Sequence, residues 1–144
     1  LQNTNADDVL ISLIIESGDF INNLFATSSE NMSRDYAITY LSILYFLTFF
    51  LSAFLSNAAV AVVLTPIAIA LSIEIGVNHE PFLMAICFGA SASFMTPMGY
   101  QTNMMVFAPG QYKFSDFLLL GLPLTIIFWI TAVIFIPKFW NFSI

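Results

Sequence analysis

An uncharged window of the sequence, residues 81–112, contains the run Thr96-Pro97-Met98-Gly99-Tyr100-Gln101-Thr102-Asn103. Within a helix, proline removes an amide donor and clashes with the preceding turn, and glycine adds backbone freedom. A continuous helix that faces lipid would not carry this run. We therefore predict a discontinuous transmembrane helix over 81–112, in which a helix begins at Pro81, unwinds, and continues as a short helix that ends near Pro109-Gly110.

A second break falls in another uncharged window, residues 36–73, whose centre reads Ser56-Asn57-Ala58-Ala59. This window is too long for one membrane span, which needs about 20 apolar residues. We predict a re-entrant helical hairpin over 36–75, with arms at 36–55 and 59–75. Irregular backbone at membrane depth is tolerated where protein or a water-filled cavity satisfies it. Two full spans joined by a very tight turn are the alternative.

The remaining segments flank these two breaks. Residues 117–137 predict a C-terminal transmembrane helix, with Trp140 beside Lys138 at the membrane interface. Residues 1–35 predict the end of a preceding helix, interrupted at Glu16-Ser17-Gly18-Asp19, and then a polar loop. Because the chain opens with a polar, acidic stretch rather than a signal peptide, we expect it to be the C-terminal part of a longer membrane protein.

The composition indicates a protein that lies in lipid. Hydrophobic residues make up 59% of the 144 residues and charged residues only 8%, whereas a soluble domain carries about 25% charged residues. The sequence therefore predicts an all-α integral membrane protein, which we expect in the plasma membrane. We expect no nucleic-acid partner, because the net charge is −6 and the basic residues Arg34, Lys113 and Lys138 are scattered.

Both breaks are rich in Ser, Thr and Asn and contain no charged residue. Broken membrane helices present amide groups at their N-termini, which suit anions, and carbonyl groups at their C-termini, which suit cations. Hydroxyl and amide oxygens are hard ligands appropriate for sodium, and an Asn amide can also donate to a sulfate or carboxylate oxygen. Asn57 and Asn103 are the strongest candidates because each sits at a predicted break. Ser52 or Ser91 alone would more often bond a neighbouring helix, and Gly89 to Ser93 would form a close-packing surface.

Two other classes of function compete with transport. A non-transporting membrane subunit or channel segment would use the same helix breaks only for packing. An intramembrane enzyme would need a constellation of acid, base or nucleophile, and the apolar windows 36–73, 81–112 and 117–137 contain no charged residue. We therefore expect no enzymatic activity and retain the subunit or channel as the alternative.

Five stretches of the sequence together carry a family resemblance: Ser56-Asn57-Ala58-Ala59, Leu64-Thr65-Pro66-Ile67-Ala68, Ala90 through Asn103, Gly110 through Phe117, and Gly121-Leu122-Pro123-Leu124. They resemble the divalent anion–sodium symporter family, in the branch of permeases related to sulfate transporters. The resemblance covers residues 10–140, and its most specific part is the run from Gly99 to Asn103.

The resemblance implies an elevator-type transporter, usually dimeric and built from two inverted repeats, of which this chain would hold the second. It implies sodium-coupled transport of sulfate or of di- and tricarboxylates, with the missing N-terminal repeat of the same protein completing the site. The third tip position is often Thr or Asn in the family, so Ala58 lacks one side-chain oxygen. The implied substrate contacts are Ser56, Asn57, Ala58, Thr102 and Asn103, and the implied sodium ligands are Ser52, Asn57, Thr96, Pro97 and Asn103.

Overall fold

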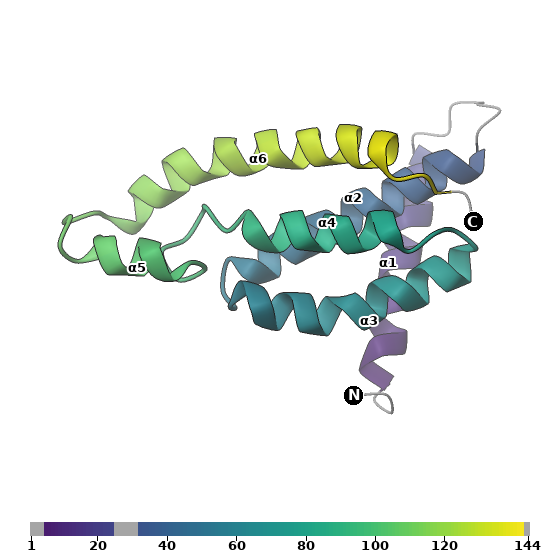
Figure 1. The fold of residues 1–144 in the computed structure, drawn as a ribbon, viewed down its shortest axis with the longest axis horizontal. Helices are drawn as coiled ribbons and strands as arrows, with labels where there is room; N and C mark the ends of the chain where they lie inside the picture. The colour runs from purple at the N-terminus through teal and green to yellow at the C-terminus, as the bar shows by residue number, and fades with distance from the viewer. Residues whose placement is uncertain (1–4, 25–31, 143–144) are drawn as a thin grey trace.

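A computed structural model describes residues 5–24 and 32–142, and these residues form helices and no strand (Figure 1). The all-α expectation is therefore confirmed for this part of the chain. Most of the expected polar loop after the first helix lies outside the described residues. The helices are α1 (Asn5–Leu24), α2 (Met32–Ser52), α3 (Asn57–Ile75), α4 (Glu80–Ser91), α5 (Gln101–Phe107) and α6 (Phe114–Phe139).

α2 and α3 run antiparallel and are joined by the short turn 53–56, so they form a helical hairpin (Figure 1). α4 lies against both arms. The contact between α2 and α4 is close because Gly89 has no side chain: a Cβ there would lie 3.1 Å from Thr48 Cβ. Ala85, one turn earlier on α4, is fully buried. The close-packing surface expected on this helix is therefore confirmed at Gly89.

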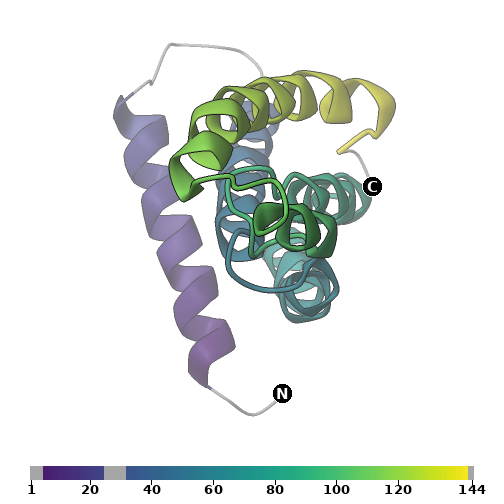
Figure 2. The same ribbon diagram turned by 90° about the vertical axis from the view of Figure 1, so that its left-hand side faces the viewer.

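α1 crosses the other helices steeply (Figure 2). The run from Glu16 to Asp19, expected to interrupt a helix, lies inside α1. Its contact with α2 explains the difference. A Cβ at Gly18 would lie 2.2 Å from Tyr40 Cε1, and the Tyr40 hydroxyl donates to Asp19 Oδ1 at 2.8 Å. A partner helix thus compensates for glycine and polar residues that weaken a helix locally.

The break after α4 begins earlier than the sequence predicts. α4 ends at Ser91, and residues 92–100 are not helical. The small residues at this end favour helix weakly, and the last turn tightens as the Ala92 amide donates to the Gly89 carbonyl at 3.2 Å. Thr102 and Asn103 consequently lie in the first turn of α5 rather than in the unwound segment.

α3 and α6 are long and apolar enough to cross a membrane, by length and composition. Tyr36–Ser52 of α2 and all of α4 are shorter apolar helices. In the most apolar stretch of α6, only 22% of the residues are buried within the chain. The other side chains of α6 are largely exposed hydrophobic groups. Such a surface is unfavourable in water and meets acyl chains in a bilayer, which is the environment expected for a membrane protein.

Leu44→Ala tests the packing of α2 in the core. Leu44 is fully buried, and its truncation leaves a cavity whose lining loses contacts. Lipid is as apolar as leucine, so the substitution mainly loses packing contacts rather than hydrophobic burial. We expect the free energy of unfolding to fall by about 2 kcal/mol, the low end of the range for truncation of a buried leucine. Thermal unfolding in detergent micelles measures the effect, with Leu119→Ala as control because Leu119 is 77% exposed. Equal unfolding midpoints for the two variants would contradict the described core.

Candidate functional site

The two helix breaks meet in space, where α2 ends, α3 begins and residues 92–100 leave α4 (Figure 1). The Thr96 hydroxyl donates to the Ala53 carbonyl across a sequence separation of 43 residues. Gly99 packs directly on the end of α2, where a Cβ would lie 2.6 Å from the Ser52 carbonyl oxygen. Since a main-chain carbonyl cannot move aside as a flexible side chain would, the contact requires glycine at this position.

Polar groups from α2, α3, α4 and the unwound segment 92–100 form a compact group between the breaks, which we call the oxygen cluster. Ser52 Oγ lies 2.8 Å from Asn57 Oδ1 and 2.7 Å from the Ala90 carbonyl oxygen. Ser93 Oγ lies 3.4 Å from the same Asn57 oxygen and 3.4 Å from the Gly99 carbonyl oxygen. Ser52 is fully buried and Ser93 is 3% exposed, so both hydroxyls are removed from bulk solvent.

The oxygen cluster holds more acceptors than hydrogens. Each serine hydroxyl carries one hydrogen, and the two hydroxyls face the Asn57 side-chain oxygen and the carbonyls of Ala90 and Gly99. Two arrangements satisfy these groups. A cation among the oxygens would balance the surplus of lone pairs, or the Asn57 amide would rotate so that Nδ2 donates to both hydroxyls. One side chain can therefore adapt the cluster to the presence or absence of a cation.

Thr96 holds the unwound segment in place. Its hydroxyl accepts from the Gly99 amide at 3.1 Å while it donates to the end of α2, and its carbonyl oxygen accepts from Asn103 Nδ2 at 3.4 Å. Thr96 is 5% exposed, and Pro97 after it is buried. Proline has no amide hydrogen to satisfy, which suits a buried segment without a helical ladder.

The predicted site residues fall into two groups in the structure. Among the expected substrate contacts, Ser56, Ala58 and Thr102 are exposed. Ser56 caps α3, where its hydroxyl accepts from the Ala59 amide at 3.3 Å. The expected sodium ligands lie on or beside the contact between the two breaks: Ser52, Asn57, Thr96, Pro97 and Asn103.

The sequence does not identify two members of the site, Ser93 and Gly99. Ser93 is predicted to belong to a packing surface because small residues surround it, and Gly99 is predicted only to break the helix. The early end of α4 directs Ser93 toward the hairpin, and the close approach of Gly99 to α2 depends on a distant segment. A polar residue shortly before a proline break is the one signal in the sequence that could have identified Ser93.

The electrostatics of the site are set by neutral groups. No charged side chain occurs in residues 52–58 or 93–103. In the part of the chain that the structure describes, no group of three or more His, Cys, Asp or Glu could hold a metal ion. A cation here would be bound by neutral oxygens, and the charge of an anion beside it would be balanced by that cation rather than by a side chain.

Comparison with known proteins gives a consistent result. The sequence profile of the citrate transporter family matches residues 3–142. The chain is 43% identical over 102 residues to the uncharacterized transporter YfbS of Escherichia coli, covering 71% of this chain and 17% of that protein. It is 32% identical over 117 residues to sodium/sulfate cotransporter 2 of Chlamydomonas reinhardtii, covering 81% of this chain and 13% of that protein. The chain thus spans less than a fifth of the length of these relatives, and no solved structure matches it.

Thr96→Val removes the hydroxyl that joins the two breaks and keeps the shape of the side chain. We expect the Gly99 amide to exchange its hydrogen about five- to ten-fold faster, because it loses an acceptor whose net contribution is about 1 kcal/mol. Hydrogen–deuterium exchange over residues 92–100 measures this. Thr131→Val is the matched control, since the Thr131 hydroxyl bonds to the Ile127 carbonyl of its own helix at 2.7 Å. Unchanged exchange would contradict the role assigned to Thr96.

Proposed function

Because this chain belongs to the citrate transporter family, we propose that it carries one half of the cation and anion sites of a sodium-coupled secondary transporter for divalent anions. The family and the relatives are transporters, not enzymes. The oxygen cluster is the observation that carries the proposal, since it is neutral, has both serine hydroxyls buried, and is richer in acceptors than in hydrogens.

Sodium is the proposed cation, and it would be cargo rather than a resident cofactor. Hard oxygen ligands suit it, and relatives named sodium/sulfate cotransporters support this choice. Ser52 Oγ and Asn57 Oδ1 would bind it from the hairpin, with Ser93 Oγ beside them. Thr96 and Pro97 would contribute carbonyl oxygens of the unwound segment, and Asn103 would contribute from α5.

The proposed link between cation and anion is the Asn57 amide. When sodium holds Oδ1, Nδ2 must point away from the oxygen cluster, where it can donate to an anion. When sodium leaves, the rotated amide donates to the serine hydroxyls instead, and this donor is withdrawn from the anion. Sodium binding would thereby raise anion affinity, and by linkage the anion would raise sodium affinity. The exposed Ser56, Ala58 and Thr102, with Asn103, would complete the anion contacts of this chain.

The proposed substrates are sulfate and di- or tricarboxylates. The family description names citrate, and several relatives are named for sulfate. For the whole protein, the family resemblance supports an elevator mechanism in which α2 and α3 form a re-entrant hairpin. It also supports a second, inverted repeat that completes the site, a homodimer, and a location in the plasma membrane.

Uptake of labelled sulfate and citrate tests the proposal. In vesicles that hold the full-length protein, we expect uptake to require an inward sodium gradient. Ser52→Ala should raise the half-saturating sodium concentration about ten-fold or more, because a ligand to a charged group contributes about 1.5–3 kcal/mol. Ser91→Ala is the matched control, as the exposed Ser91 hydroxyl bonds to the Cys87 carbonyl of its own helix at 2.9 Å. Equal uptake after replacement of sodium by potassium would refute sodium coupling.

Asn57→Asp separates the two roles of the amide. A carboxylate keeps an oxygen for sodium but cannot donate to the anion and repels it. We expect a half-saturating sodium concentration that is unchanged or lower, and an anion KM raised about ten-fold or more, since an unpaired charged contact costs at least about 1.4 kcal/mol.

The control is Asn78→Asp at the opposite end of the hairpin. Asn78 Oδ1 accepts from the Glu80 amide at 3.1 Å, a contact that aspartate keeps. An anion KM in Asn57→Asp that matches this control would show that the Asn57 amide does not donate to the substrate.

A further inference from the structure

The buried face of α6 contacts two different parts of the molecule. Toward the end of the helix it packs on the core. Nearer its beginning, Gly121 faces the unwound segment. In the middle of the helix, the half-exposed ring of Phe128 lies 5.3 Å from the ring of Phe94. The face consists of residues at helical spacing, Gly121, Thr125, Ala132, Ile136 and Pro137.

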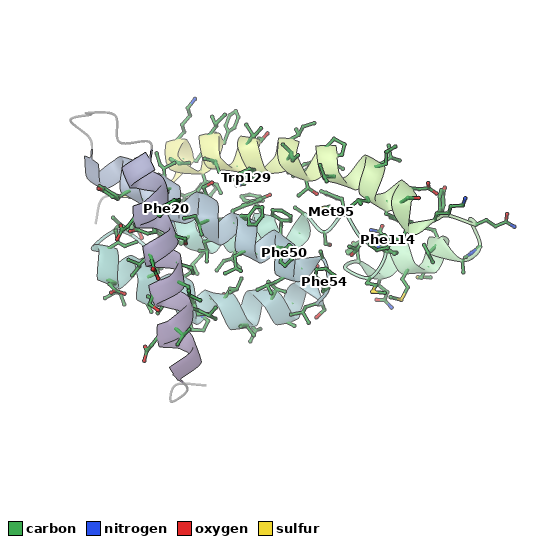
Figure 3. The ribbon with its side chains drawn as sticks, turned by 180° about the vertical axis from the view of Figure 1, so that it is seen from behind. Phe20, Phe50, Phe54, Met95, Phe114 and Trp129 are labelled. Atoms are coloured by element: carbon green, nitrogen blue, oxygen red, sulfur yellow. The ribbon has the colours of Figure 1, made fainter. Side chains whose placement is uncertain are left out.

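Gly121 contacts the backbone of the unwound segment. A Cβ at this position would lie 2.3 Å from the Phe94 carbonyl oxygen and 2.8 Å from Met95 Cα, whereas ordinary contact begins at 3.4 Å. Met95 lies between the end of α4 and α6 (Figure 3). Because the neighbours are main-chain atoms in a packed interface, a side chain at 121 must displace the segment by roughly 1 Å.

The displaced atoms lie between two polar residues of the site. Phe94 and Met95 connect Ser93 to Thr96 directly along the chain. On its other side, the same segment is held against α2 by Gly99. The segment is therefore fixed between two glycine contacts, and a shift at either contact moves the oxygens of Ser93 and Thr96.

We infer that Gly121 is a positioning residue for the cation site: its contact with Phe94 and Met95 sets where Ser93 and Thr96 stand relative to Ser52 and Asn57. The groups of a binding site must be held within about 0.5 Å of their working positions, so a displacement of roughly 1 Å is enough to weaken cation binding. This inference rests on the proposed function. It gives α6 a part in the site beyond spanning the membrane.

The test uses Gly121→Ala in the full-length protein, with Leu119→Phe as control, since it enlarges a side chain that is 77% exposed two residues away. We expect Gly121→Ala to raise the half-saturating sodium concentration for uptake about ten-fold. Most of the maximal uptake rate should return at high sodium, because a misplacement of roughly 1 Å weakens the site without removing its groups. A half-saturating concentration equal to that of the control would overturn the inference.

A second readout does not depend on sodium coupling. In a full-length background in which Cys87 and any further cysteine are replaced by serine, Met98→Cys introduces a thiol at an exposed position. The rate at which this thiol reacts with a thiol reagent is measured in sodium-free buffer. Gly121→Ala should raise this rate several-fold over Leu119→Phe, because the segment is no longer seated on α6. If parent uptake ignores sodium, the proposed function fails and the cation site with it. The labelling rate then still decides whether Gly121 positions the unwound segment.

Phe128→Ala provides a variant that adds no clash, in case Gly121→Ala does not reach the membrane. It removes the ring contact with Phe94 and should shift both readouts in the same direction by a smaller factor. The inference fails if Phe128→Ala also has the labelling rate and the half-saturating sodium concentration of Leu119→Phe. That result would show that α6 does not position the segment.

Discussion

The hydroxyl of Thr96 is the contact on which the rest of the arrangement depends. It donates to the Ala53 carbonyl at the end of α2 and accepts from the Gly99 amide in the unwound segment. A broken helix at membrane depth leaves backbone groups that lipid cannot satisfy. Here each break supplies partners for the other, so neither would be stable alone. The pairing also brings Ser52, Asn57 and Ser93 together. The Thr96 hydroxyl, which supplies hydrogen bonds to both breaks, thereby also assembles the proposed cation site.

Glycine determines how closely the segments of this chain approach one another. Gly89 lets α4 lie on α2, Gly99 lets the unwound segment lie on the end of α2, and Gly121 lets α6 lie on that segment. Between lipid-embedded helices the hydrophobic effect contributes little, so close packing and hydrogen bonds hold the structure. The neutrality of the site follows the same logic. A permanent buried charge would be costly in this environment, whereas under the proposed function a cation and an anion would arrive together and balance each other while they are bound.

Local chemistry predicted the general plan of the chain. Proline, glycine and small polar residues inside uncharged windows indicate both helix breaks. Asn57 and Asn103 are predicted as site residues because each sits at a break. The exact ends of the helices depended on tertiary contacts. Glu16 to Asp19 stay helical because Gly18 and Asp19 meet Tyr40. α4 stops at Ser91, because Ser93 and Thr96 after it bond to Asn57 and Ala53 of the hairpin instead of continuing the helical ladder.

The class of the protein, its helical makeup and the approximate positions of the two breaks within the uncharged windows can be read from residue order alone, because each follows from composition or from preferences acting over a few residues. Which groups face one another at the breaks is decided by the fold. The meeting of Thr96 with Ala53, of Ser93 with Asn57, and of Gly121 with Phe94 joins segments far apart in sequence. No local preference specifies such a pair, since the partner is chosen by how helices pack, and packing depends on the shape of every surface involved.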